Sequence, residues 1–421
     1  MLIPSNVTVE EYNEAVALEE ASHARVHFLF DDVTFQDEEL YQGGITVSTY
    51  MNPSNSMKFG TAYSTEVVVN FLKGDKTENL NFAREFTLEF GVDIGGDVEW
   101  ITIGHFIGKS ATETSYGTIE LVAYDKMPRL DVSINEFLNA LTFPCTLSDI
   151  FDELCTYFVI TPISGDEIPD VMERMVSSLD DVPINTCRDL LCLIAEANGC
   201  YAKITNEGFL QLKWFHDHTS EQELLRDNCF SYKLIKLEKT YSKKWAVLED
   251  FLWGDLEYVK YSDYDNNNNP FQITHMTALW NDPRKEVTQP PYDEFADYRT
   301  WASAENFTWE SLESYMWKEF EQADDIGGSV YTIADNQFLM YSTDEEIKAH
   351  LQLILDRLYN FALYYVATVQ MVGNWLIEPG DIVRLEIGDG EFTTYPIFNR
   401  VLQWNGSCQC SYETTGSLTA G

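Results

Sequence analysis

Two short stretches of the sequence carry side chains of the types that bind metal ions. His216-Asp217-His218 offers two imidazoles on alternate residues, which share one face when the chain is a strand. No third ligand clusters with them, so we interpret the stretch as a solvated turn. Asp263-Tyr264-Asp265-Asn266-Asn267 begins like a calcium loop, but Asn268 replaces the Gly of position six and Thr274 the Glu of position twelve. We predict no metal site and no cofactor, with a calcium or magnesium ion in this acidic loop as the alternative.

The sequence lacks the patterns of nucleophilic and phosphate-transfer catalysis. It contains no Walker loop, no G-x-G-x-x-G after a strand, no G-x-S-x-G and no H-E-x-x-H. The eight cysteines form no C-x-x-C pair and mostly lie in apolar surroundings, which is typical of reduced, buried thiols. Carboxylates are abundant, but a glycosidase pair is recognised only by its separation of about 5 to 9.5 Å. We therefore predict a protein that is not an enzyme.

Aromatic residues gather in the second half of the chain. They could stack on sugar rings, or form the core of a small subdomain or a protein interface, and we favour a core or an interface. The residues are Trp280, Tyr292, Phe295, Tyr298, Trp301, Phe307, Trp309, Tyr315 and Trp317.

The charge of the chain excludes one class of function. Among 421 residues, 27 are Lys or Arg and 69 are Asp or Glu, which gives a formal charge of -42 and a pI near 4.3. Such a chain repels phosphate backbones, so we expect no specific nucleic-acid binding. No apolar run approaches the roughly 20 residues that span a bilayer, and the first residues lack the basic region of a secretory signal. We expect a soluble protein with no transmembrane segment.

The first third of the sequence is mostly β. Residues 1–20 predict a lead-in helix. Over 21–128, short β-branched or aromatic runs bounded by Gly, Asp and Asn predict a first small β-barrel. The runs are 25–30, 44–50, 66–71, 86–90, 99–103 and 118–124.

The middle of the sequence changes its period. In 147–155 and 186–197 the apolar residues recur at helical spacing, and a predicted hairpin follows around Asn206-Glu207-Gly208, so 129–225 predicts an α+β module. Residues 226–261 predict further strands that complete a barrel. Residues 262–342 predict a loop- and aromatic-rich excursion with one helix around 308–321. Residues 343–421 predict a helix to about residue 359 and then a second small β-barrel. The fold class is α+β, mostly β.

Several motifs, in this order, resemble the tail hub proteins of tailed phages and prophages. The first is Tyr124-Asp125-Lys126-Met127, at the exit of the first barrel, and 187–199 is similar to the helix of the family's α+β module. The last is Pro379-Gly380-Asp381, within a turn similar to the one that opens the family's final barrel. The resemblance covers about 21–225 and 343–421, while 262–342 matches nothing in the family.

The resemblance implies a structural virion protein in the tail tip or baseplate, made in the host bacterial cytoplasm. It implies a homotrimeric ring in which each chain supplies two tube-like barrels, adapting a six-fold tail tube to a three-fold tip through which DNA passes during ejection. The implied partners are the tail tube or distal tail protein, the tape-measure protein, and tail fibre or receptor-binding proteins. Contact with ejected DNA would be transient, because an acidic lumen repels phosphates.

Open barrel edges must be paired or covered, and ring assembly does so. The candidate tube-forming strands carry Val67, Val68, Val69, Phe71, Tyr364, Val366 and Val369. Two alternatives stay open: a carbohydrate- or receptor-binding tail-tip module, supported by the aromatic excursion, and a cell-wall hydrolase.

Overall fold

The structure is a computed structural model. The structure describes residues 1–17, 24–51, 60–78, 80–114, 117–179, 184–225, 229–235, 273–281, 317–322, 329–334, 336, 338, 349–354, 357, 366–372, 374–388 and 390–413. The described chain is mostly β, which confirms the predicted class. Among these residues, no helix combines the length and apolar character needed to cross a membrane.

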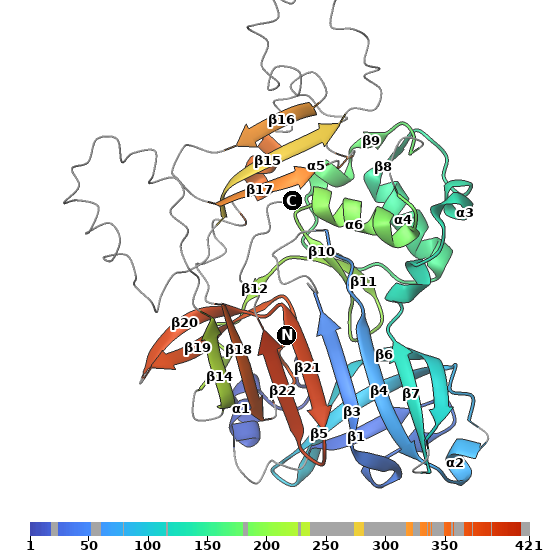
Figure 1. The fold of residues 1–421 in the computed structure, drawn as a ribbon, viewed down its shortest axis with the longest axis vertical. Helices are drawn as coiled ribbons and strands as arrows, with labels where there is room; N and C mark the ends of the chain where they lie inside the picture. The colour runs from blue at the N-terminus through green and yellow to red at the C-terminus, as the bar shows by residue number, and fades with distance from the viewer. Residues whose placement is uncertain are drawn as a thin grey trace, which may run out of the picture.

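One antiparallel sheet dominates the molecule (Figure 1). Its eleven strands run in the order β14-β18-β22-β21-β3-β4-β7-β6-β5-β1-β2. Their bounds are β1 (Arg25–Leu29), β2 (Thr34–Phe35), β3 (Leu40–Tyr50), β4 (Thr65–Leu72), β5 (Glu85–Ile94), β6 (Asp97–Glu113), β7 (Thr118–Tyr124), β14 (Cys229–Ile235), β18 (Val366–Val372), β21 (Asn399–Trp404) and β22 (Cys408–Glu413).

The N-terminal and C-terminal strands belong to the same sheet. β21 pairs with β3, for example Val401 with Ser48, so the two predicted sets of strands meet edge to edge. The sequence predicted two separate barrels, and the described strands close neither of them. The pairing of β21 with β3, which we call the joint, explains the difference. Each set of strands covers one edge of the other set, so two exposed edges are removed from the fold. The predicted domain boundaries stay a prediction, because this sheet runs across them.

Alternation of apolar and polar residues gives the sheet one buried face. Helix α1 (Val9–Ala17) covers part of this face, and its Tyr12 ring meets Trp375 edge-on at 5.9 Å between centroids. Thr8 caps α1 by accepting the Glu11 backbone N–H at 3.2 Å. Short helices α2 (Asp75–Glu78), η2 (Asp37–Glu39) and η3 (Met127–Leu130) lie between or after the first strands.

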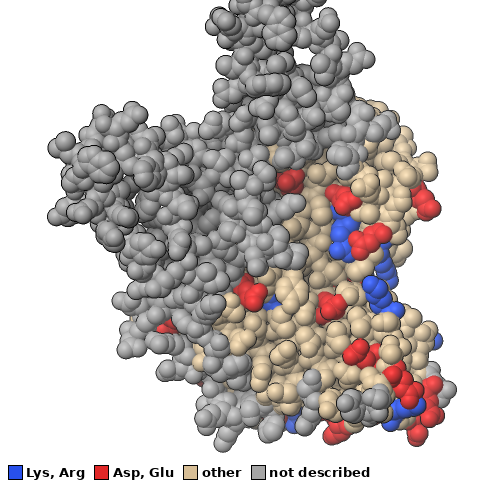
Figure 2. Space-filling view, viewed as in Figure 1, with Lys and Arg blue, Asp and Glu red and all other residues tan. Residues whose placement is uncertain are grey.

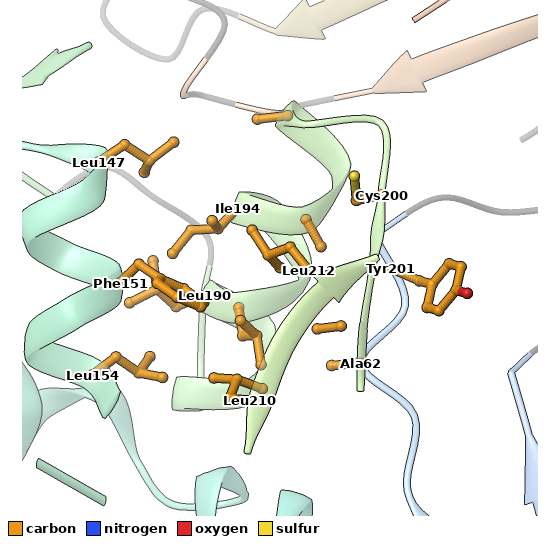
Figure 3. Close-up of a cluster of buried hydrophobic side chains, with 14 of the residues drawn as sticks. Ala62, Leu147, Phe151, Leu154, Leu190, Ile194, Cys200, Tyr201, Leu210 and Leu212 are labelled. Atoms are coloured by element: carbon orange, nitrogen blue, oxygen red, sulfur yellow. The ribbon is translucent and has the colours of Figure 1, made fainter. Parts of the chain in front are cut away.

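Helices and short strands between Ile134 and Lys213, which we call the α+β module, pack around a second hydrophobic core, to which residues such as Tyr63 and Phe398 from other parts of the chain also contribute. The module contains α3 (Ile134–Leu138), β8 (Cys145–Thr146), α4 (Leu147–Phe158), α5 (Pro169–Met172), β9 (Met175–Val176), α6 (Cys187–Ala197), β10 (Tyr201–Ile204) and β11 (Leu210–Lys213). Helices α4 and α6 each begin with a capping box, Thr146 with Asp149 and Thr186 with Asp189. Figure 3 shows the apolar side chains of both helices and of the β10–β11 hairpin converging, which confirms the predicted helices and hairpin.

A second sheet ties the module to the C-terminal part of the chain. β12 (His216–Asp217) and β13 (Glu223–Leu224) leave the module and pair in parallel with β19 (Asp381–Gly388), which also pairs with β20 (Glu391–Pro396). The sequence had predicted a solvated turn at 216–218. His216 and Asp217 are exposed, as expected for a solvated segment, but they form a short strand paired with β19 and not a turn.

The segment 262–342 contains a three-stranded sheet of β15 (Ile273–Asn281), β16 (Trp317–Gln322) and β17 (Ser329–Ala334). The helix predicted around 308–321 is wrong over 317–321, where β16 pairs with β15. The Asn-rich loop and the aromatic residues between Tyr292 and Tyr315 lie outside the described residues. In the helix predicted from 343 to about 359, residues 349–354 and 357 are helical.

Candidate functional site

The candidate tube-forming residues of β4 divide between the two faces of the sheet. Val67, Val69 and Phe71 are completely buried in the core, so they hold the sheet together and are not available to another molecule. Val68 lies between them in sequence and is half-exposed on the opposite face. The period of two in a strand causes this division. Of the four predicted residues of β4, only Val68 can belong to a contact surface.

Of the C-terminal candidates, the structure describes the burial of one. Val369 of β18 is completely buried. Val366 is the first residue of β18, where the backbone pairs with Ile235 of β14. Tyr364 lies outside the described residues. The buried candidates therefore form the core behind the surface, and the surface itself consists of the residues that alternate with them.

We call the face that carries Val68 the outer face, and across the neighbouring strands β22, β21, β3, β4 and β7 it is nearly uncharged. Register pairs place its residues side by side, for example Val68 beside Thr46 of β3 and Val122 of β7. The exposed or half-exposed side chains are Thr46, Ser48, Tyr50, Glu66, Val68, Asn70, Glu120, Val122, Tyr124, Val401, Gln403, Gln409, Ser411 and Glu413. The charged members of this set are three glutamates. Figure 2 shows the surface over β21, β22, β3 and β4 as largely tan, with a few separate acidic side chains.

Tyr124, the first residue of the family-like motif, belongs to the outer face. Its hydroxyl donates a hydrogen bond to Glu66, its direct partner across β4 and β7. This hydrogen bond is the main cause that raises the pKa of Tyr124. The Lys109 ammonium lies 5.0 Å from the centre of the Tyr124 ring. Tyr124 thus connects Glu66 of β4 with Lys109 of β6 on this face.

Asp125, the second motif residue, points away from this face and is buried. It accepts hydrogen bonds from the Ser64 hydroxyl at 2.8 Å, the Thr65 N–H at 2.7 Å and the Met127 N–H at 3.0 Å. Burial raises the pKa of Asp125 to about 6, although these hydrogen bonds act in the opposite direction. Asp125 therefore fixes the start of β4 to the end of β7, and Met127 next to it is completely buried.

The last motif, Pro379-Gly380-Asp381, forms a tight turn that admits no side chain at its centre. Gly380 has a φ of 93°, and a Cβ at this position would lie 1.6 Å from the Tyr201 hydroxyl oxygen. The Glu378 N–H donates to Asp381 Oδ2 at 2.7 Å and closes the turn. The Gly380 N–H donates to the Ile397 carbonyl at 2.7 Å. Close approach of the β10–β11 hairpin therefore requires glycine here.

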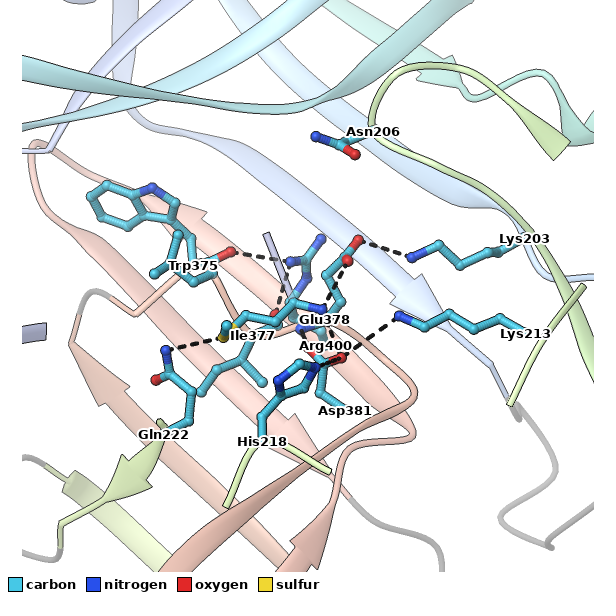
Figure 4. Close-up of polar contacts among 12 residues, drawn as sticks. Lys203, Asn206, Lys213, His218, Gln222, Trp375, Ile377, Glu378, Asp381 and Arg400 are labelled. Atoms are coloured by element: carbon cyan, nitrogen blue, oxygen red, sulfur yellow. Dashed lines mark hydrogen bonds and ion pairs between the residues drawn. The ribbon is translucent and has the colours of Figure 1, made fainter. Parts of the chain in front are cut away.

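The turn presents two buried carboxylates to the lysines of the hairpin, as Figure 4 shows. Lys203 Nζ lies 3.1 Å from Glu378 Oε1, and Lys213 Nζ lies 3.8 Å from Asp381 Oδ1. The α-amino group of Met1 lies 2.7 Å from Asp381 Oδ1. We call Lys203, Lys213, Glu378, Asp381 and Arg400 the junction cluster, since it joins the module to the sheet.

The side chains of the junction cluster are almost completely removed from water, and their pKa values reflect this. Burial opposes the ionisation of Glu378, but Lys203, the Met1 amine, Lys213 and Arg400 outweigh it and hold the pKa of Glu378 well below its usual range. Burial lowers the pKa of Lys203, and Glu378 counteracts this effect. Arg400 donates to the carbonyls of Trp375 and Ile377 at 3.3 and 2.9 Å. The charges therefore neutralise one another inside the fold.

Sequence reasoning missed most of this cluster. His218, assigned to a solvated turn, lies with Nε2 3.6 Å from Asp381 Oδ1, and His216 Nε2 lies 2.9 Å from Asp166 Oδ2. One signal was present: Lys203 and Lys213 interrupt otherwise apolar strands of the hairpin. A lysine on the inner face of a strand needs a buried acid as its partner.

The described residues include no group of three or more His, Cys, Asp or Glu side chains placed to hold a metal ion. Cys155, Cys187, Cys200, Cys408 and Cys410 are buried, as predicted for most cysteines. Burial raises the pKa of Cys155 and of Cys200 to about 12. These two thiols stay protonated at neutral pH, which makes them poor nucleophiles.

Comparisons with solved structures find phage tail and baseplate proteins. The 43 kDa tail protein of prophage MuSo2 from Shewanella oneidensis is 13% identical, with a TM-score of 0.49 over 92% of this chain and 97% of that chain. Prophage tail protein gp18 from Listeria monocytogenes EGD-e is 11% identical, with a TM-score of 0.43 over 94% and 96% of the chains. A chain of the phage P2 baseplate in its activated conformation is 8% identical, with a TM-score of 0.25 over 94% and 99%. No family model and no curated protein matches the chain.

Proposed function

We propose that the protein is a structural component of a phage tail, a hub whose copies form a trimeric ring at the tail tip or baseplate. The outer face of the sheet carries this proposal. It brings strands from both ends of the chain into one surface, and its charged residues in β22, β21, β3, β4 and β7 are three glutamates. Such a face suits the wall of a channel for DNA, because these five strands offer phosphates no basic group to bind, and the exposed Lys109 of the neighbouring β6 lies over the Tyr124 ring.

The joint between β21 and β3 supports the proposed symmetry. It places a set of N-terminal strands beside a set of C-terminal strands, so one chain supplies two neighbouring segments of wall. Three chains would then supply six segments and match a six-fold tube. β14 and β2 are the end strands of the described sheet, and we propose that neighbouring copies meet there.

The remaining parts of the molecule suit contacts with other tail proteins. In this proposal the ring meets the tail tube or distal tail protein on one side and the tape-measure protein through the channel. Tail fibre or receptor-binding proteins attach outside it. The junction cluster keeps the α+β module at a fixed position relative to the channel wall, and the protein performs no chemical reaction.

Electron microscopy of the purified protein without imposed symmetry tests the proposal. We expect three-fold rings with a central hole, and a solution mass three times that of the 48.4 kDa chain. Particles of a single chain at every concentration and salt, also when mixed with the tail tube protein, would contradict it. Glycan-array binding and cell-wall zymography test the two alternative functions, and we expect neither to give a signal.

A further inference from the structure

Helix α4 ends in a way that costs the isolated protein free energy. Val159 follows the helix in the left-handed conformation, with φ 55° and ψ 49°. Glycine is the usual residue here, because a β-branched side chain in this conformation is strained. The Val159 side chain is also 80% exposed, so it gains little from burial. Neither the backbone nor the side chain of Val159 stabilises the free chain.

Two aromatic residues precede Val159 in the chain. Tyr157 is 41% exposed. Its ring meets the rings of Phe137 of α3 and of Phe158 edge-on, at 5.7 and 5.0 Å between ring centroids. Phe158 is half-buried and packs against the core of the module. We call Tyr157, Phe158 and Val159 the α4 knob. Phe158 thus attaches the knob to the core of the module, while Tyr157 and Val159 are exposed.

The stretch of chain that carries the α4 knob has charges of one sign. Residues 131–160 contain no Lys, Arg or His, and five acidic residues: Asp131, Glu136, Asp149, Asp152 and Glu153. Asp131 is neutralised by Arg188 at 2.7 Å, and Asp149 caps the opposite end of α4, so Glu136, Asp152 and Glu153 remain. Glu153 lies one helical turn before Tyr157, so the two side chains share a face of α4. An acidic rim around an apolar centre fits a basic partner with an apolar face.

We propose that the α4 knob is a docking site for a Lys- and Arg-rich, amphipathic segment of another protein. Its apolar face covers Tyr157, Phe158 and Val159, and its cations meet the carboxylates of Glu136, Asp152 and Glu153. Burial of Val159 in the complex offsets the strain that the free chain carries. The same site on a second copy of this chain is a poor occupant, because its rim is acidic as well. The proposal does not depend on ring formation.

Two labelled peptides of equal length test the site with the full chain. One is an amphipathic Lys/Leu helix and the other is the same helix with Glu in place of Lys, and binding is followed by fluorescence anisotropy at 150 mM salt. We expect the Lys/Leu peptide to bind and the Glu/Leu peptide not to bind. A photo-crosslinking group on the Lys/Leu peptide should react mainly with residues 153–159. Crosslinks concentrated elsewhere would overturn the proposal.

The variant Val159→Asp separates docking from general attraction to an acidic protein. Asp tolerates the left-handed conformation and adds a negative charge, so binding by charge alone would stay equal or become tighter. Docking on the knob predicts at least ten-fold weaker binding together with an unchanged or higher Tm. The matched control is Met175→Asp, since Met175 is 52% exposed at the other end of α4. It should bind as the wild type does.

A second variant tests the acidic rim. Asp152→Asn combined with Glu153→Gln keeps the shape of the rim and removes two charges. We expect several-fold weaker binding and a smaller dependence on salt. Unchanged binding by this variant, or an equal loss in Met175→Asp, would remove the basis of the proposal.

Discussion

The outer face and the junction cluster reverse the usual distribution of charge. The outer face meets solvent, yet its central strands carry hydroxyl, amide and valine side chains with three glutamates. The junction cluster is buried, yet it contains Lys203, Lys213, Glu378, Asp381 and Arg400. In most proteins charged residues stay at the surface. A surface with few charges suits contact or passage, whereas paired buried charges fix one geometry.

The two regions also differ in what maintains them. The outer face follows from alternation in single strands, so many substitutions there preserve the fold. The junction cluster depends on residues far apart in sequence, such as Lys203 and Glu378, and each charge depends on its partner. The comparison therefore predicts large losses of stability at the junction and small losses on the outer face.

Gly380→Ala should give the largest effect, because the new Cβ would lie 1.6 Å from the Tyr201 hydroxyl at a φ of 93°. Adding about 1 kcal/mol for the left-handed backbone to about 3 kcal/mol for overpacking, we expect a loss of about 4 kcal/mol. Urea unfolding measures it. Gly390→Ala is the control, with a φ of 75° and open space around its Cβ, and should lose only about 1 kcal/mol. Equal losses would contradict the close approach of the hairpin.

Glu378→Gln should come next, because it leaves the Lys203 ammonium buried beside an amide. Breaking a buried ion pair costs about 3 kcal/mol. Glu378→Leu combined with Lys203→Met removes both charges and should recover most of this loss in the same urea experiment. If the double variant is as unstable as the single one, packing and not charge determines the geometry of the junction.

Acid should weaken the junction as well. The folded state holds the pKa of Glu378 below its unfolded value. The contribution of Glu378 to the free energy of unfolding is therefore present above the unfolded pKa and is lost as the pH falls through the folded pKa. The urea midpoint of the wild type should therefore fall more steeply in acid than that of the double variant. If the urea midpoints of the two proteins fall in parallel as the pH is lowered, the charge of Glu378 does not stabilise the junction as proposed.

Asp125 should show the opposite dependence on pH. The pKa of Asp125 in the folded protein, about 6, lies above the unfolded value. The contribution of Asp125 to the free energy of unfolding is therefore fully present below the unfolded pKa and is lost as the pH rises through 6. Relative to Asp125→Asn, the wild type should lose about 2 kcal/mol between pH 4 and pH 7. Comparing the two proteins cancels the other carboxylates, and a constant difference would mean that Asp125 is not desolvated.

Local patterns predicted the parts of this fold that local physics determines. The strands between Arg25 and Tyr124 follow from alternation, and α4 and α6 follow from helical spacing. The pairing of β21 with β3 joins residues about 350 positions apart, and no local pattern selects that partner. In β16, Trp317 and Phe320 have helical spacing, but pairing with β15 decides the structure.

The candidate site was predictable to a similar extent. The family-like motifs identified Asp125 and Gly380, but their roles depend on Ser64 and Tyr201, which only the fold brings near. The candidate strand β4 was located correctly, but Val67 and Val69 were assigned to a surface although they form the core. Alternation shows that two faces exist, and the rest of the fold decides which one is buried.

Substitutions on the outer face should have the smallest effect on stability and test the proposed channel directly. Val68→Lys together with Val122→Lys places two cations on neighbouring strands, and we expect less than about 1 kcal/mol of destabilisation, because both side chains are half-exposed. Wild-type rings should not retard short duplex DNA in a native gel, whereas variant rings should retard it in a salt-dependent way. The control Val132→Lys introduces one cation per chain at a valine of the module that is 45% exposed, so it should leave the DNA free. If rings of the double variant do not retard DNA either, the outer face does not line the channel. The low charge of the outer face would then be explained by contact between subunits alone.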